Sequence, residues 1–243
     1  MEVDRHRDPF PGATAVKTLA IDIGGTGVKV LVLDEQGLPL TERVRAKTPA
    51  PATPAAVLAT IEALAAEQGD YDRVSCGFPG VVRGGVTLDA PNLDPGWAGV
   101  DLAAMLTERL GRPTRVLNDA DVQGFGAIEG VGVELVITLG TGVGSALFLD
   151  GRLLPNLELG HHPWSGGRTY EQQLGRQALK TIGKKRWNKL LSKAIEQWRE
   201  VIHFQTLYLG GGHGRKVDLD LPDDVKVVSN HAGLLGGIAL WRD

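Results

Sequence analysis

The chain has 243 residues, with 42% hydrophobic and 23% charged side chains and a net charge of -3. This composition is typical of a soluble globular protein and argues against binding nucleic acid or membranes through bulk charge. A lone cysteine, Cys76, excludes an internal disulfide and any zinc site built from several cysteines. Residues 1–16 lack the apolar core of a signal peptide, so we expect a flexible arm there. No apolar run approaches the roughly 20 residues of a membrane span, and these features together favour a cytoplasmic protein.

The first half of the chain alternates predicted strands and helices. The stretch 18–34, rich in Ile, Val and Leu, predicts two buried strands around a glycine turn. Thr53 followed by Pro54 is typical of a helix N-cap and first helical position. The further expected elements are a strand at 38–46, a helix at 54–67, a strand at 73–78, a helix capped by Asp101 and ending near Leu110, and a strand at 115–117.

The second half begins with a repeat of the first. The segment LVITLGTGVGSALFLD at 135–150 matches LAIDIGGTGVKVLVLD at 19–34, and Thr141 follows Thr26 by 115 residues. A repeat this long indicates a duplicated domain rather than a solenoid. The other expected elements are helices near 120–129, 169–181, 185–202 and 231–241 and a strand at 206–209.

The alternation of strands and helices predicts an α/β fold with two similar lobes and an active-site cleft between them. Each lobe would present one glycine turn to the cleft. We expect a smaller N-terminal lobe at 17–117, completed by a C-terminal helix within 231–243, and a larger C-terminal lobe at 118–230.

Both glycine turns are candidate phosphate-binding loops, because backbone N–H groups reach a phosphate chain only where no side chain blocks them. The turn residues are Gly24, Gly25 and Thr26 in the first copy and Gly140, Thr141 and Gly142 in the second. Each could be a simple hairpin turn, but two related copies, one of them beside Asp22 and Lys29, favour phosphate binding. We expect Asp22 to hold Mg²⁺ through water.

Asn118 and Asp119 stand at the end of a predicted strand. A carboxylate there, beside a cleft, is placed to act as general base toward a hydroxyl, and a helix N-cap is the alternative. Downstream, Glu158 and His161 are candidates for binding sugar hydroxyls, since a carboxylate accepts two hydrogen bonds at once. We interpret His162 as a surface residue, and the absence of a third ligand nearby disfavours a metal site at the two histidines.

With these motifs assembled, the chain resembles the ROK family of sugar kinases, in the actin-like ATPase superfamily with its ribonuclease H-like lobes. Within that family it most resembles the polyphosphate-dependent glucokinase branch. The resemblance covers about residues 17–242. It is carried by Asp22-Ile-Gly-Gly-Thr-Gly, Gly77-Phe-Pro-Gly-Val-Val, Ala90-Pro-Asn-Leu with Trp97, Asn118-Asp-Ala-Asp, Leu139-Gly-Thr-Gly-Val-Gly-Ser, Pro155-Asn-Leu-Glu-Leu-Gly-His and Gly210-Gly-Gly.

The resemblance implies roles for individual residues, with Asp119 as the catalytic base. The implied sugar-binding set is Asn92, Asn118, Asp119, Glu158, His161 and Glu171. The implied phosphate- or nucleotide-binding set is Asp22, Gly24, Gly25, Thr26, Lys29, Gly140, Thr141, Gly142 and Gly211. The resemblance also implies Mg²⁺ as cofactor and a homodimer. Two features depart from the family pattern: no cysteine follows His161, so a structural zinc is not expected, and His213 stands where a small residue or valine is more usual.

The expected reaction is phosphoryl transfer from polyphosphate, ATP or both to the 6-hydroxyl of glucose. No Asp or Glu lies between Gln172 and Ile195, where Lys185, Lys189 and Lys193 fall at the spacing of one helix stripe. Together with Lys184 this lysine stripe is a candidate polyphosphate track, by the counterion-release argument used for nucleic acids. A solvated helix face is the alternative.

Three other functions compete with this prediction. An ATP-dependent kinase for another hexose, such as mannose, would carry the same motifs. A non-catalytic sugar-binding protein would not need Asp119 together with both glycine turns. A ROK-type repressor would carry a helix-turn-helix ahead of the kinase-like part, and we expect the roughly 17 residues before the first strand to be too few for one.

Overall fold

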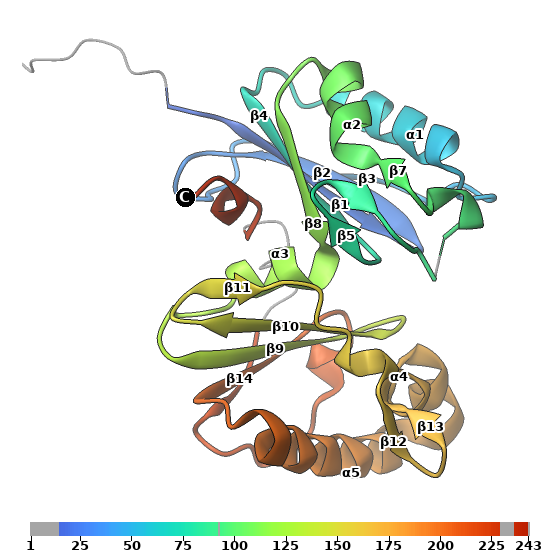
Figure 1. Cartoon of the computed structure of the whole chain (residues 1–243), viewed down its shortest axis with the longest axis vertical. Helices are drawn as coiled ribbons and strands as arrows, with labels where there is room; N and C mark the ends of the chain where they lie inside the picture. The colour runs from blue at the N-terminus through green and yellow to red at the C-terminus, as the bar shows by residue number, and fades with distance from the viewer. Residues whose placement is uncertain (1–14, 92, 229–235, 243) are drawn as a thin grey trace, which may run out of the picture.

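The computed structural model describes residues 15–91, 93–228 and 236–242, and most of its strands form two five-stranded sheets, one in each half of the molecule (Figure 1), beside two smaller sheets of three and two strands. Nearly all of the predicted arm at 1–16 lies outside the described residues. So do Asn92 and the first part of the helix predicted at 231–241. The predicted α/β class is confirmed.

The N-terminal sheet has the strand order β3-β2-β1-β4-β8. Its hairpin, β1 with β2, extends antiparallel to β3 on one side and parallel to β4 and β8 on the other. The first hairpin is buried on both faces, as its run of Ile, Val and Leu predicted. The strands are β1 (Thr18–Gly24), β2 (Gly27–Leu33), β3 (Val44–Ala46), β4 (Arg73–Phe78) and β8 (Thr114–Asn118).

The C-terminal sheet repeats this topology, with the order β11-β10-β9-β14-β15 and the same pattern of antiparallel and parallel neighbours. The duplication predicted from the sequence repeat is therefore confirmed at the level of the whole sheet. The strands are β9 (Val133–Leu139), β10 (Val143–Leu149), β11 (Arg152–Leu154), β14 (Thr206–Gly210) and β15 (Val225–Val227).

Two helices, α1 (Pro54–Ala66) and α2 (Leu102–Leu110), cover one face of the N-terminal sheet (Figure 1). Their predicted starts are confirmed, because Thr53 accepts a hydrogen bond from the Ala56 N–H and Asp101 accepts one from the Ala104 N–H. Their buried apolar residues join the core of this sheet.

The C-terminal sheet is covered by α4 (Tyr170–Leu174) and the long α5 (Arg176–Ile202). The predicted break between 181 and 185 is confirmed at Gly183, where φ is 74° and two helical stretches of α5 meet at a kink, whereas the end of α4 at Leu174 was not predicted. Glycine accommodates that backbone without steric cost. No helix in the described part of the chain is long and apolar enough to cross a membrane.

A short helix, α3 (Asp119–Phe125), lies between the two sheets beside the C-terminal turn η4 (Gly236–Trp241) (Figure 1). It is shorter than the predicted 120–129. Gly124 lets it approach β10 closely, since a Cβ there would lie 2.6 Å from the ring of Phe148. The described part of the C-terminal segment is a 3-10 helix, not the predicted α-helix, and its Ile238 packs against Ala20 and Leu31 of the N-terminal sheet.

Several small elements were not predicted. They are β5 (Val82–Arg83), β6 (Val86–Thr87), β7 (Val100–Asp101), β12 (Pro163–Ser165), β13 (Arg168–Thr169), η1 (Pro95–Trp97), η2 (Leu159–His161) and η3 (Gly214–Lys216). Each has only two or three residues, too few to show a hydrophobic period in the sequence.

Candidate functional site

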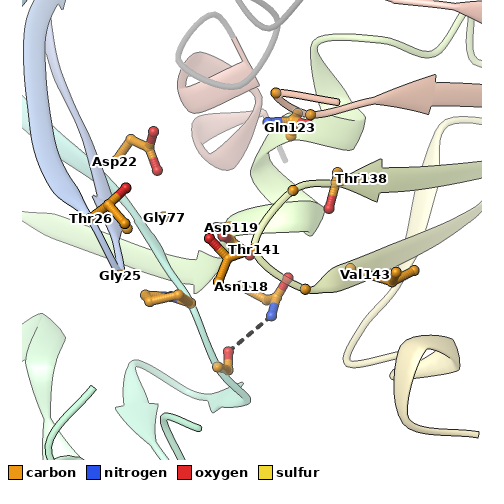
Figure 2. Close-up of a pocket in the computed structure, with 18 of the residues that line it drawn as sticks. Asp22, Gly25, Thr26, Gly77, Asn118, Asp119, Gln123, Thr138, Thr141 and Val143 are labelled. Atoms are coloured by element: carbon orange, nitrogen blue, oxygen red, sulfur yellow. Dashed lines mark hydrogen bonds between the residues drawn. The ribbon is translucent and has the colours of Figure 1, made fainter. Parts of the chain in front are cut away.

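A cavity of about 550 Å³ lies between the two lobes and is lined by residues of both. Figure 2 shows Asp22 and Thr26 of the first hairpin on one side of this space and Asp119 and Thr141 on the other. The predicted site residues that line it are Asp22, Gly24, Gly25, Thr26, Lys29, Asn118, Asp119, Gly140, Thr141, Gly142, Glu158, His161, Glu171 and Gly211.

The N-terminal wall of the cavity is built by one cross-strand row. In the sheet register Gly77 pairs with Asp22, Asp22 with Lys29, and Lys29 with Arg45. Directly opposed residues project to the same face, which places these charged side chains side by side. Within the row the Lys29 ammonium donates to the Asp22 carboxylate at 2.6 Å.

The first glycine turn is a two-residue hairpin, since Gly24 pairs with Gly27 and leaves Gly25 and Thr26 exposed at its tip. The two interpretations weighed for this segment are therefore compatible: it is a hairpin turn, and its tip also lines the cavity. The side chain of Arg45 lies across it, because a Cβ on Gly27 would be 2.5 Å from the Arg45 Nε.

The second glycine turn, at 140–142, closes with a hydrogen bond from the Gly140 N–H to the Gly142 carbonyl at 3.0 Å. The Glu171 carboxylate accepts from the Val143 N–H at 3.2 Å, and a Cβ on Gly142 would lie 2.0 Å from its Oε2. Glycine at 142 is thus required for Glu171 to lie over the turn. The structure places this predicted sugar ligand between the turn and the cavity.

Asn118 and Asp119 divide the two roles that the sequence left open. Asn118 is the N-cap of α3, with its amide oxygen accepting from the Ala120 N–H at 2.8 Å, and its amide nitrogen donates to the Gly80 carbonyl at 3.0 Å (Figure 2). Asp119, the first residue of the helix, lines the cavity. The carboxylate predicted as general base therefore directly follows a residue whose side chain anchors the start of the helix.

Burial, together with the negative charges of Asp22, Glu158 and Asp121, raises the pKa of Asp119 to about 7, against a lowering by the hydrogen bond from the Ala120 N–H. Burial likewise raises the pKa of Asp121 to about 7. Asp121 is 1% exposed and does not line the cavity. A carboxyl with a pKa near 7 is a stronger base than an ordinary aspartate and is still ionised in part at neutral pH.

Glu158 and His161 lie together on η2 and its N-terminal side, with the His161 Nδ1 at 3.9 Å from the Glu158 Oε2. Burial raises the pKa of Glu158, while the nearby His161 lowers it. His162 does not line the cavity, in line with its interpretation as a surface residue.

Five predicted residues are not among those that line the cavity, one of them because it lies outside the described part of the chain. Asn92 lies outside the described residues. Lys184, Lys185, Lys189 and Lys193 are exposed on α5 and do not line the cavity, and Lys184 forms an ion pair with Asp218 at 2.7 Å.

The structure adds lining residues that the sequence analysis did not select, namely Arg43, Arg45, Asp89, Gln123, Thr138, Arg176, His213 and Arg215. The sequence could have pointed to Arg43 and Arg45, because they stand two residues apart within the strand predicted at 38–46 and would project to the same face of a sheet. His213 follows Gly211, whose φ of 79° and close approach to the Leu139 carbonyl exclude a side chain. Burial and the charges of Arg176, Arg215 and Lys216 lower the pKa of His213.

Comparison with known proteins identifies relatives of the same architecture. The sequence model of the ROK family matches residues 18–170. The chain is 33% identical over 227 residues to a polyphosphate glucokinase of Mycobacterium tuberculosis, covering 87% of this chain and 84% of that one. It is 32% identical over 235 residues to a polyphosphate glucokinase of Mycobacterium leprae, covering 90% of this chain and 72% of that one.

Among solved structures, the crystal structure of an inorganic polyphosphate/ATP-glucomannokinase from Arthrobacter sp. strain KM superposes with a TM-score of 0.84. The two chains are 34% identical, and the match covers 93% of this chain and all of that one. The predicted fold of two actin-like lobes is thereby confirmed.

The raised pKa of Asp119 predicts a stability effect that is independent of activity. When the folded-state pKa of an acid lies above its unfolded value, stability falls as pH rises between the two values. Asp119→Asn removes this ionisation, so we expect its Tm to exceed that of the unsubstituted protein by several degrees at pH 8, with the difference shrinking toward pH 4. Thermal unfolding of both proteins across this range tests it, and an equal or lower Tm for the variant at pH 8 would contradict the buried-base assignment.

Proposed function

The chain belongs to the ROK family, and from this premise we propose that it is a glucokinase that transfers a phosphoryl group from inorganic polyphosphate or ATP to the 6-hydroxyl of glucose. The observation that carries the proposal is the position of Asp119, a carboxylate with a pKa near 7 that lines the same cavity as two glycine–threonine turns. Phosphoryl transfer requires such a base together with groups that position and neutralise the phosphates.

In the proposed reaction, the Asp119 carboxylate accepts the proton of the sugar 6-hydroxyl while that oxygen attacks the terminal phosphorus. The bond from this phosphorus to its bridging oxygen breaks, and the shortened donor leaves. Glu158, His161, Glu171 and the Asn118 amide would orient the sugar, with Asn92 as a further candidate. The N–H groups of the turns at 24–26 and 140–142 would hold the phosphates.

The residues that line the cavity fit a magnesium ion that would be held mainly by the phosphates of the phosphoryl donor. Mg²⁺ is usually bound through one or two carboxylates, substrate phosphates and water. Asp22 offers one carboxylate oxygen beside the turn, the other being bonded to Lys29. In the described part of the chain no group of three or more His, Cys, Asp or Glu residues could hold a metal alone. When bound, the ion would neutralise charge on the phosphates.

We further propose that the segments 17–117 and 118–230 act as two lobes that close on the sugar. Closure would exclude water from the cavity and so limit transfer of the phosphoryl group to water.

Replacing the proposed base should separate chemistry from binding. Asp119→Asn is expected to lower kcat by about 10²- to 10⁴-fold, the usual contribution of general-base catalysis, while glucose affinity stays within a few fold. In the unsubstituted enzyme kcat/KM should rise with pH through an apparent pKa near 7, since the base must be ionised. Steady-state kinetics between pH 5.5 and pH 8.5 measures both effects.

Asp121→Asn is the matched control, because Asp121 is a neighbouring acid with a similarly raised pKa that lies outside the cavity. It should retain turnover within about tenfold and keep the rise of activity with pH. Near-normal turnover in the Asp119 variant, or a larger loss in the control, would refute Asp119 as the base.

The donor and the sugar are tested by direct product measurement. Purified protein with Mg²⁺ and glucose should form glucose 6-phosphate with long-chain polyphosphate, and parallel reactions with ATP and with mannose define its range. Product from ATP alone would make it an ATP-dependent sugar kinase. No product with either donor on either sugar would favour the non-catalytic alternative.

A further inference from the structure

Four arginine side chains line the cavity without a carboxylate partner. They are Arg43, Arg45, Arg176 and Arg215, and in the described part of the chain none of them forms an ion pair. Other cations of the protein do have such partners, as Lys29 has Asp22 and Arg199 has Asp224. Four unpaired guanidinium groups around one cavity leave a concentration of positive charge that a polyanion would neutralise.

Two of the four arginines stand on the N-terminal lobe beside the first glycine turn. Arg45 is the register partner of Lys29, and its Nη2 donates to the Thr26 carbonyl at 3.3 Å. Arg43 directly precedes β3, two residues before Arg45, and both residues line the cavity. This pair therefore extends the charged row outward from the turn that would hold the transferred phosphate.

The other two arginines stand on the C-terminal lobe, beside the second glycine turn. The Arg176 N–H donates to the Thr141 carbonyl at 3.2 Å, which fixes this residue at the turn. Arg215 lies on η3, after the Gly211–His213 segment. Arg176, His213 and Arg215 all line the cavity, and the charges of both arginines lower the pKa of His213.

Among the described residues, none of the carboxylates that line the cavity forms an ion pair with these arginines. Asp119, Glu158 and Glu171 belong to the proposed sugar-binding set, and the ion pair that the structure gives Asp22 is with Lys29. The four guanidinium groups are thus left to meet a phosphate chain in the same cavity that would hold the sugar.

We infer that these arginines bind the phosphate chain of the donor beyond its transferred group, with Arg43 and Arg45 on one side and Arg176 and Arg215 on the other. The inference rests on the proposed use of a polyphosphate donor and names the residues that would recognise it. It assigns chain binding to the cavity wall, whereas the lysine stripe at 185, 189 and 193 lies on α5 outside the cavity.

The test measures binding of polyphosphate of defined chain length without glucose, as a function of salt, by titration calorimetry. The variants are Arg43→Gln with Arg45→Gln, and Arg176→Gln with Arg215→Gln. Each pair should weaken polyphosphate binding by at least about tenfold, since hydrogen bonds to charged groups contribute roughly 1.5–3 kcal/mol. The slope of log affinity against log salt should fall by roughly 0.7 to 1 for each arginine removed.

Three controls make the result specific. The triple variant Lys185→Gln, Lys189→Gln, Lys193→Gln removes more positive charge than either pair but should change the affinity by less than about twofold. Arg43→Lys with Arg45→Lys keeps the charge and should retain most of the salt slope. Unchanged Tm and glucose affinity in the arginine variants would show that the fold and the sugar site are intact.

The inference and the proposed function can fail separately. If the unsubstituted protein binds polyphosphate with the predicted arginine dependence but forms no glucose 6-phosphate, the proposed function fails and the binding site stands. An unchanged affinity and slope in both arginine pairs, an equal loss in the lysine variant, or no polyphosphate binding at all would overturn the inference.

Discussion

The position of the Asp119 carboxylate depends on the amide of Asn118, which binds both the helix that follows it and the loop that contains Gly80. Its oxygen accepts from the Ala120 N–H and so defines the first turn of α3, while its nitrogen donates to the Gly80 carbonyl. Gly80 must be glycine for the loop to come this near, since a Cβ there would lie 2.2 Å from the Asp89 carbonyl oxygen. Asp119 therefore enters the cavity from a backbone held on two sides. Preorganisation of this kind keeps a base in reach of its substrate without an ordering cost at the moment of reaction.

The same position makes Asp119 a stability liability. Burial and the charges of Asp22, Glu158 and Asp121 all disfavour its ionised form, and a group that is harder to ionise when folded makes folding less favourable at neutral pH. This cost to folding accompanies a stronger base, because the elevated pKa of about 7 makes the carboxylate a better proton acceptor than an ordinary aspartate. In the part of the chain that the structure describes, no arginine is among the groups that lower the pKa of Asp119, so the cations of the cavity do not relieve this cost.

Much of the fold could be predicted from the sequence, because its helix starts and turns depend on residues close together in the chain. The helix starts at Thr53 and Asp101, the glycine turns, and the repeat at 135–150 all depend on short-range chemistry, and the structure confirms them. The missed features depend on tertiary contacts. Arg215 reaches the cavity because η3 follows the carboxyl end of β14, and an element of three residues is too short to show a periodic pattern in the sequence. The lysine stripe shows the opposite limit. Its spacing correctly predicted one face of a helix, but spacing alone does not determine whether that face lies toward the cavity. The roles of the site residues themselves stay predictions, to be decided by the variants above.

The duplication explains why the two hairpins carry different chemistry. In the first copy Asp22 faces Lys29 across the hairpin, and in the second the corresponding pair is Thr138 with Gly144. A Cβ on Gly144 would lie 2.9 Å from the Ala120 Cβ, so α3 occupies the space that a lysine side chain would need. The helix that presents Asp119 packs on the second hairpin, and that contact leaves only the first hairpin free to bear a charged row. Because α3 follows the first sheet in the chain but rests on the second, the base lies between the two turns. The duplication thus presents two related turns with different surroundings: a charged row on the first hairpin, and on the second a packing face for the helix that carries Asp119.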